Sequence, residues 1–225
     1  MNTEQARFNM IEQQIRPWNV SDSTVLGLLS TVKREDFVPA AHKGLAFADL
    51  EIPLLGSGEE SLAKGQCMLA PRLDARMLQD LAVRPSDTVL EIGTGSGYTA
   101  ALLASMAQRV ITVEINPDLA ATARTNLRNA GIQNVEVRVA DGAKMSVVDG
   151  RFDVIALSGS VAEIPDSLLG LLKVGGRLGA IVGDEPMMRA TVVTRTSEAS
   201  FNTVQGWDTV APRLQNFPEP SRFKL

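Results

Sequence analysis

A buried strand that runs into three alternating glycines constrains this chain more than any other feature. Residues 89–98 read VLEIGTGSGY, an apolar strand followed by Gly93, Gly95 and Gly97 and then by the start of a helix. Backbone without side chains can approach a ligand closely at such a turn, at the carboxyl end of the strand, where open α/β proteins bind ligands. A plain tight strand-to-helix turn is the alternative for an isolated glycine motif. The segment therefore predicts an α/β fold and favours a nucleotide-type site.

Strand and helix patterns alternate through the rest of the chain. Short apolar runs predict strands at residues 88–92, 110–114, 135–139, 154–157 and 177–182, and helical patterns predict helices at 71–81, 98–107, 117–130 and 165–172. Apolar strands separated by helices predict a parallel sheet with helices on both faces. Two further strands, at 190–196 and 202–210, follow one another without a helix. We therefore expect an antiparallel edge on a Rossmann-like sheet of the methyltransferase type.

Acidic side chains accompany three successive strands of this pattern. Glu114 ends the strand after the glycine turn, at the spacing where an acid binds a ribose diol, and Asp141 follows the next strand, where it could accept an adenine amino group. A dinucleotide fingerprint would need glycine at Tyr98, whereas a GxGxG turn beside Glu91 suits a cationic sulfonium cofactor. Each acid alone could instead be a helix N-cap or a solvated strand end.

Together these features predict S-adenosylmethionine as the cofactor and S-adenosylhomocysteine as its product. The residues predicted to bind the cofactor are Glu91, Gly93, Thr94, Gly95, Gly97, Tyr98, Glu114, Ile115, Asp141 and Gly142.

Composition limits the class of protein. The chain has 225 residues of which 44% are hydrophobic, enough for one domain, in which we expect a helical and lid region at residues 1–70 and a cofactor-binding core at 71–225. A net charge of -4 argues against a nucleic-acid partner. One cysteine, Cys67, and one histidine, His42, leave no cluster for a structural metal. No apolar run suits a bilayer and no signal-peptide pattern begins the sequence, so we expect a cytoplasmic protein without a membrane partner.

The first 70 residues predict helices followed by a long loop. Phe8, Ile11 and Ile15 recur at helical spacing, and Ser21 or Asp22 could cap a second helix. Residues 44–65 contain proline and several glycines and are predicted to be a loop. Loops of this length are usually functional or mobile, so we interpret this one as a lid or a substrate wall.

No catalytic acid, base or nucleophile is predicted. Methyl transfer is an in-line displacement, in which the protein aligns two reactants and excludes water. A carboxylate acceptor is already ionised at neutral pH and needs no general base, whereas an amine or phenol more often would. We interpret His42 as a structural residue and Cys67 as a packed thiol. Ser96, in GTGSG, lies one place off the serine-hydrolase nucleophile pattern.

Several segments, taken in order, resemble those of protein-L-isoaspartate O-methyltransferases. They are residues 34–39 (REDFVP), 46–49 (AFAD), 52–54 (IPL), 65–66 (GQ) with Pro71, and 89–98. The resemblance spans roughly residues 5–185. It implies a repair enzyme that methylates the α-carboxyl of isoaspartyl residues in proteins or peptides, after which a succinimide forms and reopens.

The same resemblance implies an acceptor segment made of Gly65, Gln66, Cys67, Met68 and Leu69. Family members usually carry GQTIS there, with the serine at the acceptor carboxylate, and Leu69 stands in its place. Leucine cannot hydrogen-bond a carboxylate. The family's C-terminal RFVPL-type segment has only a loose counterpart in residues 209–214. Two alternatives therefore stay open: a methyltransferase of the same fold with a small-molecule acceptor, and a non-catalytic S-adenosylmethionine-binding protein.

Overall fold

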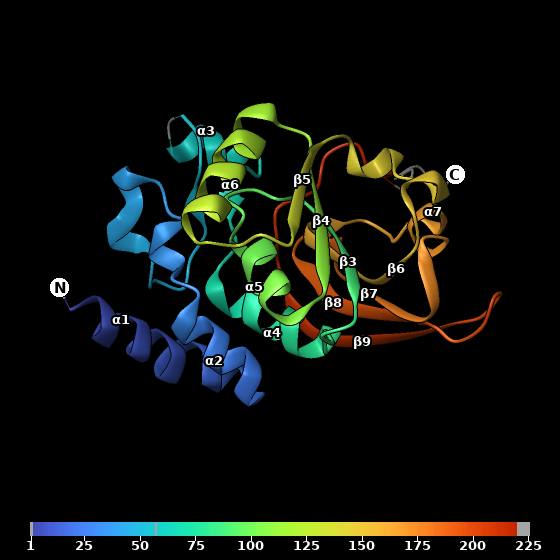
Figure 1. Ribbon diagram of the computed structural model, residues 1–225, viewed down its shortest axis with the longest axis horizontal. Helices are drawn as coiled ribbons and strands as arrows, with labels where there is room; N and C mark the ends of the chain where they lie inside the picture. Colours follow the sequence, from blue (N-terminus) through green and yellow to red (C-terminus); the bar gives the residue numbers. More distant parts are fainter. Residues whose placement is uncertain (1, 57, 220–225) are drawn as a thin grey trace.

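The computed structural model describes residues 2–56 and 58–219, which are built around a seven-stranded sheet (Figure 1). The strand order is β5-β4-β3-β6-β7-β8-β9. The first five strands in this order run parallel, and β8 and β9 are antiparallel additions at one edge. This confirms the mostly parallel sheet with an antiparallel edge. The strands are β3 (Thr88–Ile92), β4 (Arg109–Glu114), β5 (Val135–Val139), β6 (Phe152–Val161), β7 (Leu172–Asp184), β8 (Met187–Arg195) and β9 (Phe201–Thr209).

The central strands are apolar on both faces because each face is covered. Successive side chains of a strand point to opposite faces, so Val89 and Leu90 of β3 belong to two different hydrophobic cores. Val110, which pairs with Val89, lies in the same core as Val89, and Ile111 lies with Leu90. Continuous apolar runs in the sequence therefore mark strands buried on both sides.

Longer helices cover one face of the sheet, and shorter pieces of chain cover the other. The first core receives side chains from α4 (Pro71–Leu81), α5 (Tyr98–Met106) and α6 (Pro117–Asn129). The second receives Leu168 of α7 (Asp166–Leu169), Met145 and Phe217. Near Met145 the chain forms the 3-10 turns η5 (Gly142–Lys144) and η6 (Val147–Asp149).

The predicted helix at 165–172 is wrong in its second half. The structure has a single turn, α7, and Leu172 already pairs with Phe152 as the first residue of β7. Leu171 and Leu172 are fully buried against the sheet. Strand pairing and burial therefore override the helical pattern of this segment.

The N-terminal region packs beside α4 and α5, where Figure 1 shows α1 and α2 in blue. Asp22 caps α2, since its Oδ1 accepts hydrogen bonds from the Thr24 and Val25 amides at 2.8 and 3.0 Å. This confirms one of the two predicted caps. The elements are α1 (Thr3–Met10), η1 (Ile11–Ile15), η2 (Arg16–Trp18), α2 (Ser23–Thr31), η3 (Arg34–Asp36) and η4 (Ala40–Leu45).

Residues 44–65 are not the irregular loop that the sequence predicts. They contain short secondary structure of their own, and residue 57 lies outside the described residues. The Ser61 hydroxyl accepts hydrogen bonds from the Leu54 and Leu55 amides and donates one to the Gln66 carbonyl at 2.6 Å. These contacts tie the segment to the acceptor segment that follows it. Its elements are β1 (Ile52–Pro53) and α3 (Gly58–Ala63), and β1 pairs with β2 (Cys67–Met68).

Among residues 2–56 and 58–219, no helix combines the length and the apolar character that crossing a bilayer requires.

Candidate functional site

The glycine turn after β3 has a backbone that other residues would adopt only with strain. Gly93, Gly95 and Gly97 have φ values of 96°, 52° and 86°, in the left-handed region that favours glycine. A Cβ on Gly93 would lie 3.1 Å from the Ser158 carbonyl oxygen. A Cβ on Gly97 would lie 3.3 Å from the side chain of Ala123 on α6. Gly93 therefore brings β3 close to the end of β6, and Gly97 lets α5 and α6 pack together.

Glu114 points at this turn from the end of β4. Its Oε2 accepts a hydrogen bond from the Gly95 amide at 2.9 Å, and its Oε1 accepts one from the Asn116 amide at 3.0 Å. The side chain is 6% exposed. Each carboxylate oxygen can accept a further hydrogen bond, so Glu114 is held in one orientation and can still receive the two hydroxyls of a diol.

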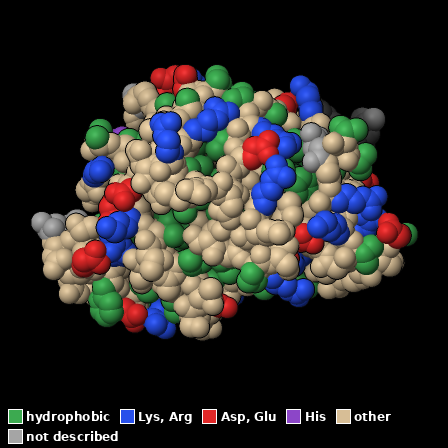
Figure 2. Space-filling view, in the orientation of Figure 1, with side chains coloured by type: hydrophobic (Ala, Val, Ile, Leu, Met, Phe, Trp, Pro, Cys, Tyr) green, Lys and Arg blue, Asp and Glu red, His purple; other side chains and the backbone are tan. Residues whose placement is uncertain are grey.

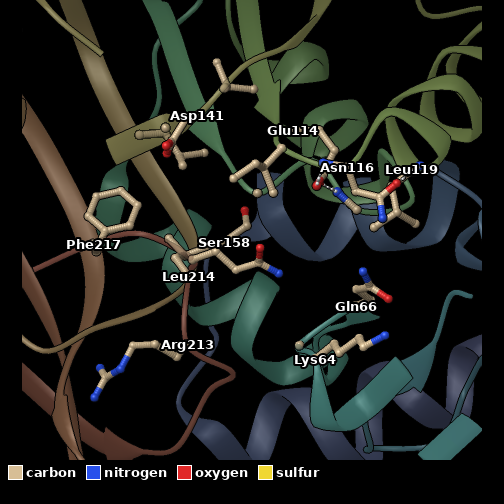
Figure 3. Close-up of a pocket in the computed structure, with 18 of the residues that line it drawn as sticks. Lys64, Gln66, Glu114, Asn116, Leu119, Asp141, Ser158, Arg213, Leu214 and Phe217 are labelled. Carbon is tan, nitrogen blue, oxygen red and sulfur yellow. Dashed lines mark hydrogen bonds between the residues drawn. The ribbon is translucent and has the colours of Figure 1, made fainter. Parts of the chain in front are cut away.

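A cavity of about 640 Å³ opens at the carboxyl ends of β3, β4, β5 and β6, and we call it the strand-end cavity. Figure 3 shows Glu114, Asn116 and Leu119 on one side of it, with Asp141 and Phe217 apart from them and Gln66 and Lys64 across the opening. The lining residues are Lys64, Gly65, Gln66, Cys67, Ile92, Gly93, Gly95, Val113, Glu114, Ile115, Asn116, Leu119, Asp141, Gly142, Ser158, Arg213, Leu214, Gln215 and Phe217.

Asp141 lines the strand-end cavity and is also a cap. Its Oδ1 accepts from the Ala143 amide at 3.1 Å at the start of η5, which is the N-cap role that the sequence left open. Its Oδ2 accepts from the Asn216 amide nitrogen at 3.0 Å and lies 3.1 Å from Lys144 Nζ. Although partial burial opposes ionisation, the contacts with Asn216 and Lys144 hold the pKa of Asp141 below its usual value.

Glu91 does not line the strand-end cavity but lies beneath it. The side chain is fully buried, and its two oxygens accept hydrogen bonds from Thr112 Oγ1 at 2.7 Å and from Ser158 Oγ at 2.8 Å. Thr94 continues this network, with its hydroxyl 2.6 Å from that of Thr112. Burial, with the nearby acids Asp74 and Glu114, raises the pKa of Glu91 to about 8 in spite of these hydrogen bonds.

A smaller space of about 270 Å³, which we call the side cavity, adjoins the strand-end cavity. The two share Cys67, Gly93, Gly95 and Ser158. The residues that line the side cavity are Cys67, Met68, Leu69, Asp74, Gly93, Thr94, Gly95, Ser96, Tyr98, Thr99 and Ser158.

Leu69 also lines a third, apolar cavity of about 390 Å³. It shares Leu69, Asp74, Thr99 and Ser158 with the side cavity. Most of its remaining lining is aliphatic, contributed by Leu73, Met77, Leu78, Leu81, Leu103, Ala156, Leu157 and Ile181. Ser158 therefore lines all three cavities, and Leu69 lies between polar and aliphatic lining.

Arg34 fixes the segment that carries Leu69. Its buried guanidinium donates to the Leu69 carbonyl at 2.6 Å and to the Ala46 carbonyl at 3.1 Å, and its Nη1 lies 3.3 Å from Asp74 Oδ2. Burial raises the pKa of Asp74 to about 6, although Arg34 and the Thr99 hydroxyl oppose the shift. The guanidinium also lies over the Tyr98 ring, 5.0 Å from its centroid.

The Cys67 thiol is poorly suited to act as a nucleophile. Burial, with the neighbouring Glu51, raises its pKa to about 12, and the thiolate is the reactive form. Among the described residues, no group of three or more His, Cys, Asp or Glu side chains could hold a metal ion.

The sequence-predicted site residues divide into three groups in the structure. Gly93, Gly95, Glu114, Ile115, Asp141 and Gly142 line the strand-end cavity, together with Gly65, Gln66 and Cys67 of the acceptor segment. Thr94, Tyr98, Met68 and Leu69 line the side cavity. Glu91 and Gly97 line neither cavity. Glu91 is buried beneath the strand-end cavity and bonded to Ser158, and Gly97 packs against α6.

Sequence reasoning missed several residues that line the strand-end cavity. Ser158 follows the predicted strand at 154–157, so the rule that singled out Glu114 and Asp141 could also have found it. Arg213, Leu214 and Phe217 come from the C-terminal segment, where Leu214 and Ser160 share a backbone hydrogen bond of 2.9 Å. That segment carries no local signal beyond its loose likeness to a family motif.

Comparison with known proteins gives consistent matches. A family model described as protein-L-isoaspartate(D-aspartate) O-methyltransferase matches residues 5–210. A protein-L-isoaspartate O-methyltransferase of Koribacter versatilis is 38% identical over 189 residues, 84% of this chain and 81% of that protein. One of Methanoculleus marisnigri is 40% identical over 177 residues, 79% of this chain and 77% of that protein.

A solved structure from Plasmodium falciparum shares the fold. It is described as a candidate protein-L-isoaspartate O-methyltransferase in complex with S-adenosyl-L-homocysteine. The likeness covers 96% of this chain and 99% of that one, with a TM-score of 0.76 and 18% sequence identity.

Proposed function

The chain belongs to the protein-L-isoaspartate(D-aspartate) O-methyltransferase family, and we propose that its strand-end cavity holds the cofactor and its side cavity the acceptor carboxylate. It is therefore an S-adenosylmethionine-dependent methyltransferase, with S-adenosylhomocysteine as the product. The acceptor proposed for it is an isoaspartyl residue of a protein or peptide, as the names of its relatives say of those proteins.

The residues of the strand-end cavity fit such a cofactor. S-adenosylmethionine supplies a methyl group on a positively charged sulfur. Glu114, oriented by the Gly95 and Asn116 amides, would accept hydrogen bonds from the ribose hydroxyls. Asp141 lies farther along the cavity and would meet the adenine, and the turn at Gly93 allows close approach of backbone.

The acceptor side of the reaction needs alignment more than acid–base chemistry. A carboxylate is already ionised at neutral pH, so no base has to remove a proton from it. The chain contributes a wall, made by residues 65–69, that is held by Arg34 and by the β1–β2 pair. This wall would orient the acceptor and exclude water from the reacting atoms.

One observation supports this proposal above the others. The strand-end cavity and the side cavity meet at Cys67, Gly93, Gly95 and Ser158, so a donor in one and an acceptor in the other could approach each other there. These four shared residues come from three segments that are far apart in the sequence, and two of the segments carry motifs that resemble the family, residues 65–66 and 89–98.

The direct test is methyl transfer from labelled S-adenosylmethionine to a synthetic peptide that contains one isoaspartyl residue. We expect a base-labile methyl ester on that peptide and none on the matched peptide with ordinary aspartate. Label that resists treatment with base, or equal labelling of the isoaspartyl and aspartyl peptides, would contradict the isoaspartyl acceptor. Calorimetric titration with S-adenosylhomocysteine tests the cofactor half separately.

Leu69 and the apolar cavity behind it favour a second candidate function, methylation of a small, less charged acceptor. A buried carboxylate without a hydrogen-bond donor is costly, whereas the aliphatic lining would accept an apolar group. Cofactor binding without any ester on the isoaspartyl peptide would favour this candidate. It would equally suit a non-catalytic binding protein, and screening small carboxylic acids for methyl esters separates the two.

Surface charge and the packing of the N-terminal region bear on partners and domain organisation. On the face shown in Figure 2, basic and acidic side chains are interspersed, which agrees with a peptide partner better than with a nucleic acid. The N-terminal helices contact α4 and α5, which supports one folding unit over residues 1–225. The single free thiol, Cys67, suits a reducing compartment such as the cytoplasm.

A further inference from the structure

Glu91 is a buried carboxyl group with acids rather than cations around it. Within the described part of the chain it forms no salt bridge, and the charged groups that influence it are Asp74 from α4 and Glu114 from β4. Asp74 is itself paired with Arg34. Such a carboxyl holds its proton more tightly than a carboxyl in water because ionisation would leave a buried negative charge without a counter-ion.

Two hydroxyl groups connect Glu91 to its surroundings. Thr112 connects Glu91 to Thr94, which lines the side cavity, and Ser158 lines the strand-end, side and apolar cavities. When Glu91 is ionised, its oxygens can only accept, so Ser158 donates to it and presents lone pairs to the cavities. When Glu91 is protonated, it can donate to Ser158, whose own proton can then point into the cavities. The charge of Glu91 therefore determines whether Ser158 presents a lone pair or a proton to a ligand in the cavities.

We propose that Glu91, acting through Ser158, discriminates the positively charged sulfonium of S-adenosylmethionine from the neutral thioether of S-adenosylhomocysteine. This rests on the proposed cofactor site. A positive charge in the cavity favours the ionised form of Glu91 and the donating orientation of Ser158 toward it. The Glu91 O–H bond breaks, Ser158 Oγ takes that proton and passes its own to water in the cavity, and one proton leaves to solvent.

The methyl transfer itself would reverse this state. Once the methyl group has left, the sulfur is neutral and no longer stabilises the ionised form of Glu91. Glu91 then takes up a proton by the same route, and the site again suits a neutral sulfur. The ammonium and carboxylate groups are common to both ligands, so the difference between them isolates the effect of the sulfonium.

The sign of the pH dependence follows from this linkage. Burial raises the pKa of Glu91 in the free protein to about 8, and a bound sulfonium lowers it. Binding of S-adenosylmethionine therefore strengthens as the pH rises toward 8, by up to about tenfold per pH unit. Binding of S-adenosylhomocysteine changes little from this source over the same range. The ratio of the two affinities is expected to grow from pH 6 to pH 8.

The experiment is isothermal titration calorimetry of the full chain at pH 7, in two buffers with different ionisation enthalpies, which gives the protons released per bound ligand. We expect close to one proton for S-adenosylmethionine and close to none for S-adenosylhomocysteine. Sinefungin, which carries an amine-bearing carbon in place of the methylsulfonium, should release a proton as S-adenosylmethionine does. The variant Glu91→Gln should show no difference in proton count between the ligands.

Two further variants test whether the released proton depends on Glu91 rather than on another carboxylate, and whether it passes through Ser158. Glu136→Gln removes a half-exposed carboxylate on β5, outside the strand-end cavity, and should keep the proton release. Ser158→Ala keeps Glu91 but removes the connecting hydroxyl, and should reduce the difference between the ligands.

Equal proton counts for the two ligands would overturn the inference, as would a difference that survives in Glu91→Gln. Equal counts in the wild type overturn the inference even if a variant fails to fold. Absence of binding by either ligand would instead contradict the cofactor site itself, and the inference with it.

Discussion

At the scale of single residues, Leu69 is the position at which the acceptor site differs most from the family pattern. Its side chain lines both the side cavity and the apolar cavity. We predict that Leu69→Ser raises kcat/KM for an isoaspartyl peptide relative to Leu69→Ala. A hydroxyl that donates to a carboxylate is worth about 1.5–3 kcal/mol, which corresponds to at least about tenfold. Steady-state kinetics of the two variants measures the difference.

Leu69→Ala is the matched control because it removes the same bulk without adding a hydroxyl. Equal rates for the serine and alanine variants would show that a missing hydrogen-bond donor does not limit activity on this acceptor.

Glu114 is the residue whose geometry most directly defines the cofactor site. In Glu114→Gln, one oxygen becomes an amide nitrogen that cannot accept from the Gly95 or Asn116 amide. We expect S-adenosylhomocysteine to bind about tenfold to a hundredfold more weakly, from loss of about 1.5–3 kcal/mol of charge-assisted hydrogen bonding. Calorimetry gives the affinity, with Glu136→Gln as the control. Unchanged affinity would argue against a ribose at Glu114.

At the scale of elements, η3 controls the acceptor segment through Arg34. In Arg34→Met, the carbonyls of Leu69 and Ala46 lose their donor and Asp74 loses its ion-pair partner. We predict a loss of about 3–5 kcal/mol in the free energy of unfolding, as is usual when one member of a buried pair is removed. Urea denaturation followed by circular dichroism measures it.

A double variant, Arg34→Met with Asp74→Leu, tests the reason for that loss. Because no unpaired buried charge remains, we expect part of the stability to return. If the double variant is as unstable as Arg34→Met alone, the loss comes from the two carbonyls rather than from Asp74.

At the scale of the whole molecule, the buried acids predict how stability depends on pH. Burial raises the pKa of Glu91 to about 8 and that of Asp74 to about 6. These two carboxyl groups therefore bind more protons in the native state than in the unfolded state between about pH 4 and pH 8, and their contribution to stability falls as the pH rises through that range. We expect Glu91→Gln to gain in stability relative to the wild type from pH 5 to pH 8.

Urea unfolding at pH 5, 6.5 and 8 checks this prediction. A stability difference between Glu91→Gln and the wild type that stays constant across the three pH values would contradict a raised pKa at Glu91.

Also at this scale, aromatic contacts join the N-terminal region to the far edge of the sheet. Trp18 and Trp207 meet edge to face, with ring centroids 6.3 Å apart, and Trp207 Nε1 donates to Asp80 on α4 at 2.8 Å. We predict a single cooperative unfolding transition for the whole chain. The variant Trp207→Leu should lower the free energy of unfolding by about 1–3 kcal/mol. Calorimetric melting measures both. Two separate transitions would mean that the N-terminal region and the core are distinct domains.

Much of the core of the fold could be predicted from the sequence. The strand Thr88–Ile92 and the helices that begin at Pro71, Tyr98 and Pro117 have local patterns of periodicity, proline and glycine that tertiary contacts reinforce. The pattern failed where pairing at a distance competed with it, as at Leu172, which joins β7 instead of a helix. It also failed in residues 44–65, where contacts of Ser61 order a segment that has loop composition.

The sequence by itself determined that glycines and acids would meet at one edge of a parallel sheet, because the carboxyl ends of parallel strands converge there. It could not determine which of these groups would face a ligand. Only the tertiary structure decided that Glu114 points into the strand-end cavity while Glu91 lies beneath it, and that Ser158 and Leu214 complete the lining. The physical reason is that a side chain's exposure and charge depend on neighbours that are distant in the chain, and local patterns carry no information about them.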